Sequence, residues 1–290
     1  LKCSAKIAFT INLSHSNVLG RQAISNYWHV LNPNLQPMYS ALGYTINWTQ
    51  LLDTGGTVFS DSLFQIRDAF SERELPPLLY DKVKDVDGGK DDSLSLYKMK
   101  LQFPFAVQSN VESLEASYDK FATQNDLFRA VSGEEQPLIT DISGQIQNGT
   151  ATLAVGENTQ VLYFYGTNTG ENPVTIYVNG TPVKIPASYY YENEQYPSDF
   201  CNGLVCLGAF KNETVTVQFA TNAAVTDLHL GMLDYALLEQ TADTLKNQGM
   251  QVTDLKQKNS GASFAVKDAK AGSVFVPVPY DENWKCKVNG

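Results

Sequence analysis

The sequence predicts an α+β protein in which an N-terminal mixed α/β domain is followed by a jelly-roll-like β-sandwich with one inserted helix. Three observations lead to this prediction. Apolar residues make up 43% of the 290 and charged residues 18%, which is the balance of a chain that folds. The first half mixes helical and extended patterns. The second half alternates short apolar runs with Gly, Asn and Pro, as β-sandwiches do.

The first half begins with an extended stretch over residues 6–14 and a short helix over residues 22–30. Asp61 is expected to cap an apolar run that continues as a strand over residues 67–70. Residues 78–82 and 93–98 flank a polar, acidic segment, which predicts a hairpin with a long loop. The apolar stretch 101–107 contains Pro104, which favours an edge strand.

A helix over residues 114–131 ends the first half. Leu114, Phe121 and Leu127 follow the helical period, and Ser132-Gly133 supplies the stop signal. We place a domain boundary here, with an N-terminal α+β domain over residues 1–134 and a sandwich resembling a carbohydrate-binding module over residues 135–290.

Short strands are expected through the second half, at residues 151–155, 160–166, 174–178, 183–185, 214–220, 225–232, 251–256, 262–266 and 273–278. Asn179-Gly180 between two apolar runs is the clearest hairpin turn in the chain. One helix, residues 235–247, interrupts the strands and stops at Gly249.

Charge and spacing exclude several classes of function. A net charge of −10 without basic runs argues against nucleic-acid binding. No stretch approaches the roughly 18 to 20 apolar residues of a membrane span. The motif around Ser263 lacks the second glycine of a nucleophile elbow, and the three histidines are far apart in sequence. The sequence therefore predicts no catalytic residue, no cofactor and no metal site.

Aromatic residues in polar segments are the candidate glycan contacts, because flat rings stack on sugars while their edges stay wet. The alternative is that these rings cover the core of a tyrosine-rich fold. The candidates are Trp48, Tyr189, Tyr190, Tyr191 and Tyr196. The spacing of Cys201 and Cys206 suits either a disulfide around a turn or two buried thiols.

Several segments, in order along the chain, resemble the YfhO-type family of bacterial multi-pass membrane proteins. The closing stretch carries Pro279-Tyr280-Asp281, Trp284 and Asn289-Gly290, and departs from the family pattern in having Asn283 where glycine is usual. The earlier segments are Asp61-Ser62-Leu63-Phe64-Gln65-Ile66-Arg67, Ser95-Leu96-Tyr97, Phe103-Pro104-Phe105-Ala106, Gln124-Asn125-Asp126-Leu127-Phe128 and Leu207-Gly208-Ala209-Phe210.

The resemblance implies a protein similar to GT-C-class glycosyltransferases, which move sugars from polyprenyl-phosphate carriers to lipoteichoic acid or other envelope polymers. It places this region on the extracytoplasmic face of the cell membrane, partnered by transmembrane helices outside this sequence. The family's acidic catalytic loop matches nothing here, so the region itself is expected to position the acceptor glycan or to brace the membrane domain. The alternatives are a non-catalytic carbohydrate- or protein-binding module and a secreted glycoside hydrolase.

Overall fold

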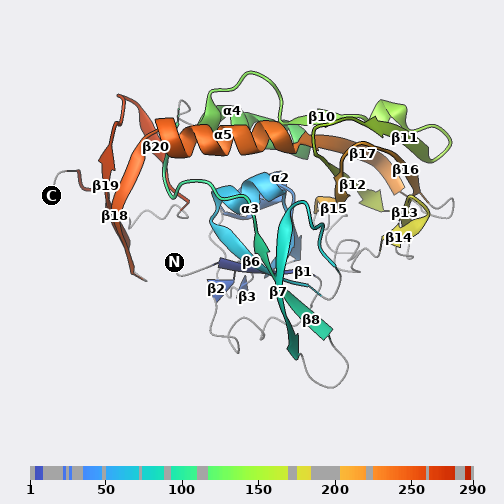
Figure 1. The fold of residues 1–290 in the computed structure, drawn as a ribbon, viewed down its shortest axis with the longest axis horizontal. Coiled ribbons are helices and arrows are strands. Elements are labelled where there is room, and N and C mark those ends of the chain that lie inside the picture. The colour runs from blue at the N-terminus through green and yellow to red at the C-terminus, as the bar shows by residue number, and fades with distance from the viewer. Residues whose placement is uncertain are drawn as a thin grey trace.

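Strands are the main elements of the structure, a computed structural model that describes residues 4–8, 22–23, 26–27, 35–47, 50–71, 74–87, 93–109, 117–168, 175–183, 203–219, 225–258, 261–277 and 285–288. The α+β class is confirmed, with a β-sandwich in the second half and helices packed on one of its sheets (Figure 1). Within these residues, no helix is both long and apolar enough to cross a membrane.

The β-sandwich consists of two four-stranded antiparallel sheets. In order, the first contains β10 (Ile139–Asp141), β17 (Val225–Asp234), β12 (Gln160–Asn168) and β15 (Val205–Phe210). The second contains β11 (Thr150–Val155), β16 (Glu213–Phe219), β13 (Ile176–Val178) and β14 (Thr181–Val183). Asn179 and Gly180 join β13 to β14 with φ angles of 50° and 78°. This pair of positive angles makes the predicted two-residue hairpin turn.

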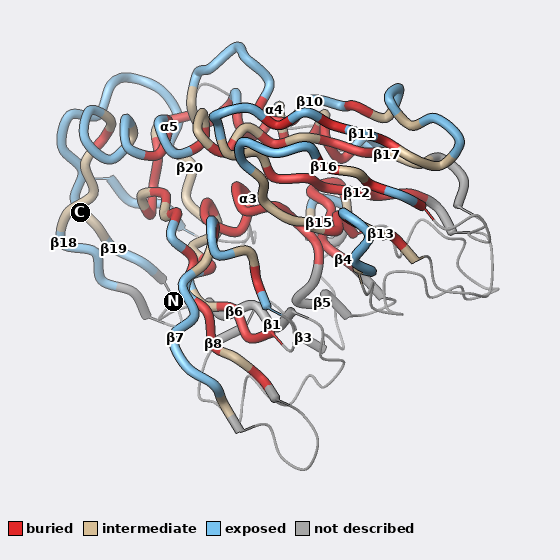
Figure 2. Tube along the Cα trace, turned by 45° about the vertical axis from the view of Figure 1, so that its right-hand side comes forward, coloured by how far each residue is buried: buried red, intermediate tan, exposed pale blue. Residues whose placement is uncertain are grey.

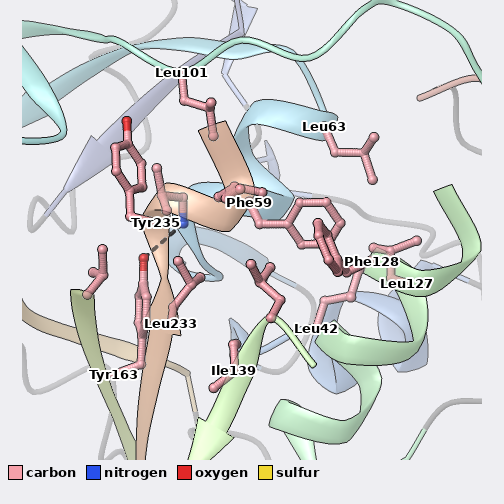
Figure 3. Close-up of a cluster of buried hydrophobic side chains, with 14 of the residues drawn as sticks. Leu42, Phe59, Leu63, Leu101, Leu127, Phe128, Ile139, Tyr163, Leu233 and Tyr235 are labelled. Carbon is pink, nitrogen blue, oxygen red and sulfur yellow. Dashed lines mark hydrogen bonds between the residues drawn. The ribbon is translucent and has the colours of Figure 1, made fainter. Parts of the chain in front are cut away.

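The first sheet of the sandwich is buried on both faces. Leu162 of β12 points between the two sheets, whereas its neighbour Tyr163 points the opposite way, because successive side chains in a strand alternate. The outer face is covered by α4 (Lys120–Ser132) and α5 (Tyr235–Gln248), whose apolar residues join the same cluster as Tyr163 (Figure 3). The sandwich and its helices therefore form three layers.

Both long helices begin at an aspartate. The carboxylates of Asp119 and Asp234 accept hydrogen bonds from the amides of Ala122 and Leu237, each at 3.0 Å. Such caps satisfy amides that have no partner within the helix. The two predicted helices are confirmed, although α4 begins later than expected.

The first half of the chain builds a five-stranded mixed sheet and a three-stranded antiparallel sheet. The five-stranded order is β2 (Gln22–Ala23), β1 (Ser4–Ala8), β6 (Ile66–Ser71), β8 (Ser93–Met99) and β7 (Tyr80–Asp87). The three-stranded order is β3 (Asn26–Tyr27), β5 (Gln50–Gly55) and β4 (Tyr44–Asn47). The hairpin predicted around the acidic loop is β7 and β8.

Two expectations in this half were wrong. The described residues 22–23 and 26–27 are strands, not a helix, because each pair joins a strand from elsewhere in the chain. The helix α3 (Val58–Leu63) is capped by Thr57 rather than by Asp61. Thr57 and Ser60 form a capping box, which leaves Asp61 inside the first turn. One further helix, α2 (Leu35–Ala41), precedes β4.

After α5 the chain forms an antiparallel ribbon from β18 (Gln251–Lys258) and β19 (Gly261–Lys267). The next strand, β20 (Ser273–Phe275), pairs with β9 (Val107–Ser109) in the first half of the chain. Of the predicted edge strand at 101–107, only the last residue is in a strand. Residues 285–288 form no strand, and Cys286 and Val288 are exposed.

One hydrophobic cluster joins the two halves of the chain. Phe59 and Phe103 of the first half, Phe128 of α4, and Tyr163 and Leu233 of the sandwich all belong to it. The short helix η1 (Ser143–Gln145) lies at the edge of the sandwich. The two expected domains thus share a core, and their boundary at residue 134 stays a prediction.

Candidate functional site

A buried network of polar side chains lies where α3 meets α4. We call it the polar hub, and it consists of Tyr44, Thr57, Ser60, Asp61 and Gln124. Each of these residues is at most 2% exposed. The Thr57 hydroxyl donates to Gln124 Oε1 at 2.9 Å, and the Tyr44 hydroxyl donates to Asp61 Oδ1 at 2.8 Å. A substrate cannot reach these atoms without unfolding their surroundings.

The polar hub also binds the backbone of the segment before β4, and a related hydrogen bond lies beside it. Gln124 Nε2 donates to the Leu42 carbonyl at 2.7 Å. The Val58 amide, at the start of α3, donates to the hydroxyl of Tyr163 on β12 at 2.9 Å (Figure 3). Burial raises the pKa of Tyr44 and of Tyr163 well above the usual tyrosine value, since ionisation there would place a charge in the core.

A second branch extends from α3 to residues 103 and 104. The Phe103 amide donates to Ser62 Oγ at 2.9 Å, and Gln65 Nε2 donates to the carbonyl of Phe103 at 3.0 Å and to that of Pro104 at 3.3 Å. Side chains therefore satisfy the backbone groups that strand pairing would otherwise satisfy. This explains why the predicted edge strand at 101–107 is largely irregular.

A cluster of ionisable groups lies across β12 and β17, the two central strands of the first sandwich sheet. The rings of Tyr165 and His229 stack with centroids 4.3 Å apart and planes 6° from parallel. The Tyr165 hydroxyl donates to Asp119 at 3.3 Å, and His229 Nδ1 lies 3.7 Å from Asp141 Oδ2. Burial, and then the carboxylate of Asp119, raise the pKa of Tyr165. Because Tyr165 is buried and the imidazole ring stacks on it, the pair packs the outer face of the sheet rather than presenting a reactive group.

The outer face of the second sandwich sheet has no Asp, Glu, His, Lys or Arg side chain. Strand alternation and register put eight side chains on it. Tyr177 lies between Pro182 on one neighbouring strand and Gln218 on the other, and threonines occupy most of the remaining positions. The eight are Thr150, Thr152, Ala154, Tyr177, Pro182, Thr214, Thr216 and Gln218.

A cavity of about 260 Å³ lies between the ends of α4 and α5 and the segment that follows β19. Gln108, which lines it, is already held on both sides of its amide. Its Nε2 donates to the Lys270 carbonyl at 2.8 Å, and its Oε1 accepts from the Lys270 amide at 3.0 Å. Among the described residues, no three His, Cys, Asp or Glu side chains come close enough together to hold a metal ion.

The candidate glycan residues from the sequence cannot be placed. Trp48, Tyr189, Tyr190, Tyr191 and Tyr196 lie outside the described residues, and so does Cys201. Cys206 is half-buried on β15, and its pairing with Cys201 stays a prediction. Sequence reasoning missed the face around Tyr177, although the alternating threonines at 150 and 152 and at 214 and 216 were a usable signal.

Comparison with known proteins gives one match. The family model described as bacterial membrane protein YfhO matches residues 16–290, nearly the whole chain. No curated protein and no solved structure matches.

Proposed function

The chain belongs to the YfhO family of bacterial membrane proteins, and we propose that it is the extracytoplasmic, water-facing region of such a protein. Its role is to brace the membrane-embedded part, which would transfer sugars from a polyprenyl-phosphate carrier to lipoteichoic acid or another envelope polymer. In this proposal the region supplies a rigid frame, and the transfer chemistry belongs to the membrane-embedded part.

The observation that carries the proposal is the position of the segments that resemble the family. Asp61 and Gln124 belong to the polar hub, while Ser62 and Gln65 hold residues 103 and 104. These side chains bond to hub residues and to the backbone; Asp61, Ser62 and Gln124 are buried, and Gln65 is partly buried. Buried networks that satisfy their polar groups rigidify a fold, so this arrangement suits a frame better than an active site.

Substitutions in the full-length protein, assayed in native membranes, test the bracing role. Asp61→Asn keeps the size of the side chain and an oxygen that accepts from Tyr44, so we expect folded protein that retains sugar transfer. Gln124→Ala removes two buried hydrogen bonds, and we expect transfer to fall in parallel with the amount of folded protein. Folded Asp61→Asn protein without transfer activity would refute the proposal, because a frame has no need of the carboxylate.

A second candidate function is recognition of the acceptor glycan, and the uncharged face around Tyr177 favours it. A sheet face with a tyrosine ring, hydroxyls and an amide offers both stacking and hydrogen bonds to a neutral sugar. A glycan-array and wall-polymer screen tests this, with Tyr177→Ala, Tyr190→Ala and Trp48→Ala beside the parent chain. Tyr118→Ala is the matched control, since Tyr118 is 90% exposed and lies away from this face.

Binding that Tyr177→Ala abolishes while Tyr118→Ala retains it would assign recognition to this face. Loss through Tyr190→Ala or Trp48→Ala instead would assign it to the residues first selected from the sequence. A parent chain that binds no glycan would remove this second candidate and leave the bracing role untouched.

A further inference from the structure

The ribbon of β18 and β19 extends from one end of the molecule (Figure 1). Among the described residues, its two strands pair only with each other. One face packs on the body, where Val252 and Phe264 contact Phe105 and Met250. The rings of Phe105 and Phe264 meet edge to face with centroids 5.7 Å apart. Figure 2 shows that most of the ribbon is nevertheless exposed.

Lysines occupy the opposite face of the ribbon. Lys267 pairs with Gln251, and Lys256 pairs with Ser263. Because Ser263 and Lys267 alternate with Phe264 along β19, both lysines project away from the face that packs on the body. Four residues of strand separate the two positions, roughly 14 Å at the usual rise of a strand.

The charge of this region is opposite to that of the rest of the chain. Six lysines against four acidic residues give residues 251–290 a formal charge of +2, which leaves −12 for residues 1–250 of a chain whose net charge is −10. We call the described, exposed part of this region the basic ribbon. Its charged residues are Lys256, Lys267, Lys270, Lys285, Lys287, Asp254 and Asp268.

The lysines of the basic ribbon are not neutralised by nearby carboxylates. No ion pair between described residues includes any of these five lysines. The segment with Lys285 and Lys287 lies beside β18 and β19 in both views of the chain (Figures 1 and 2). Their charges therefore add to that of the ribbon.

Exposed aliphatic side chains occur in the same region as the lysines. Leu255, Val274 and Val288 are each at least 40% exposed, and Val266, which is 44% exposed, lies on the same side of β19 as Phe264. At a bilayer surface, ammonium groups interact with lipid phosphates while aliphatic side chains enter the boundary of the acyl region. A soluble anionic partner could bind through the lysines alone and would have no use for exposed aliphatic side chains.

We infer that the basic ribbon docks on the anionic phospholipid surface of the membrane in which the full-length protein resides. The inference rests on the proposed position of this region beside a membrane. The strongly negative body is repelled by the same surface, so the molecule approaches with the ribbon first. Docking would fix the orientation of the frame relative to the bilayer, which family membership alone does not.

Flotation with lipid vesicles tests the inference on the 290-residue chain. Vesicles of phosphatidylcholine alone are compared with vesicles that contain one third phosphatidylglycerol, at low and at high salt. The ribbon variant carries Lys256→Gln, Lys267→Gln and Lys285→Gln. The control carries Lys84→Gln, Lys98→Gln and Lys211→Gln, three exposed lysines of the body, so both variants have the same net charge.

We expect the parent chain to bind only the anionic vesicles, and less tightly at high salt. The ribbon variant should lose roughly 100-fold in partition coefficient, at about tenfold per 1.4 kcal/mol and about 1 kcal/mol for each lysine near the surface. The control should bind as the parent does. Thermal unfolding of both variants shows whether either substitution disturbs the fold.

Three results would overturn the inference. They are no binding of the parent chain to anionic vesicles, equal losses in the ribbon and control variants, and release by inorganic phosphate at constant ionic strength, which would mark a site for the free ion. None of these depends on sugar transfer. A negative vesicle result therefore does not contradict the bracing role. A negative result in the sugar-transfer assay likewise does not contradict membrane docking.

Discussion

The hydrogen bond from the Val58 amide to the Tyr163 hydroxyl is the most direct test of how the two halves of the chain are joined. Tyr163 is 3% exposed, and the bond is 2.9 Å long. Tyr163→Phe removes one oxygen atom and changes nothing else in the packing. It leaves the Val58 amide buried without its partner at the start of α3, and such a loss costs about 1 to 3 kcal/mol.

Equilibrium unfolding in urea measures this cost, with tryptophan fluorescence and circular dichroism as independent probes. We expect the midpoint to fall by an amount that corresponds to about 2 kcal/mol, with an unchanged dependence on urea, because the surface exposed on unfolding is the same. Tyr177→Phe is the matched control. Its hydroxyl lies on the open face of the second sandwich sheet, where its loss should cost less than about 0.5 kcal/mol.

Equal effects of the two Tyr→Phe substitutions would refute this reasoning, as the Val58–Tyr163 bond would then contribute nothing beyond an exposed hydroxyl. A Tyr163→Phe chain that unfolds in two separate steps would refute a stronger point. It would show that the sandwich and the first half are only loosely joined, despite the cluster they share.

Three further predictions concern the same core and its surface. Gln124→Met keeps the volume of the side chain but removes the acceptor of the Thr57 hydroxyl proton and the donor to the Leu42 carbonyl, so urea unfolding should show a loss of about 2 to 4 kcal/mol; a loss below about 1 kcal/mol would contradict the role of the polar hub. Gly231→Ala would place a methyl group 2.5 Å from the buried ring of Phe121, so the free energy of unfolding should fall by about 1 to 3 kcal/mol in the same urea measurement. Phe121→Leu in the same chain makes room for the methyl group and should recover part of that loss. Burial, and then Asp243, raise the pKa of Glu239 in the folded state, so the folded chain holds this proton more tightly than the unfolded chain does. Ionisation of Glu239 therefore costs more free energy in the folded chain than in the unfolded chain. This cost is absent below roughly pH 4, where both states are protonated, and is complete above the raised pKa. Glu239→Gln should thus raise the melting temperature at pH 7 and leave it unchanged at pH 3.

Elements defined by local signals were predicted well. Asn179-Gly180 makes its hairpin because both residues tolerate positive φ, a property of those two residues alone. The helix that follows Asp234 was also predicted, since its apolar spacing and stop signal lie within one short stretch. Residues 22–23 and 26–27 misled for the opposite reason. Their pairing with β1 and β5 depends on other segments of the chain, and this pairing outweighed the local helical pattern.

The sequence by itself determined the fold class, the order of most strands and helices, and the family, because these follow from periodicity, turn chemistry and local motifs. Only the tertiary structure decided which contacts the family-like segments make. The partners in the polar hub are 67 residues apart for Thr57 and Gln124, and Val58 and Tyr163 are 105 residues apart. It also decided that Lys256 and Lys267 share one face of the ribbon. Contacts over such separations depend on how complete elements pack, and no local pattern encodes them.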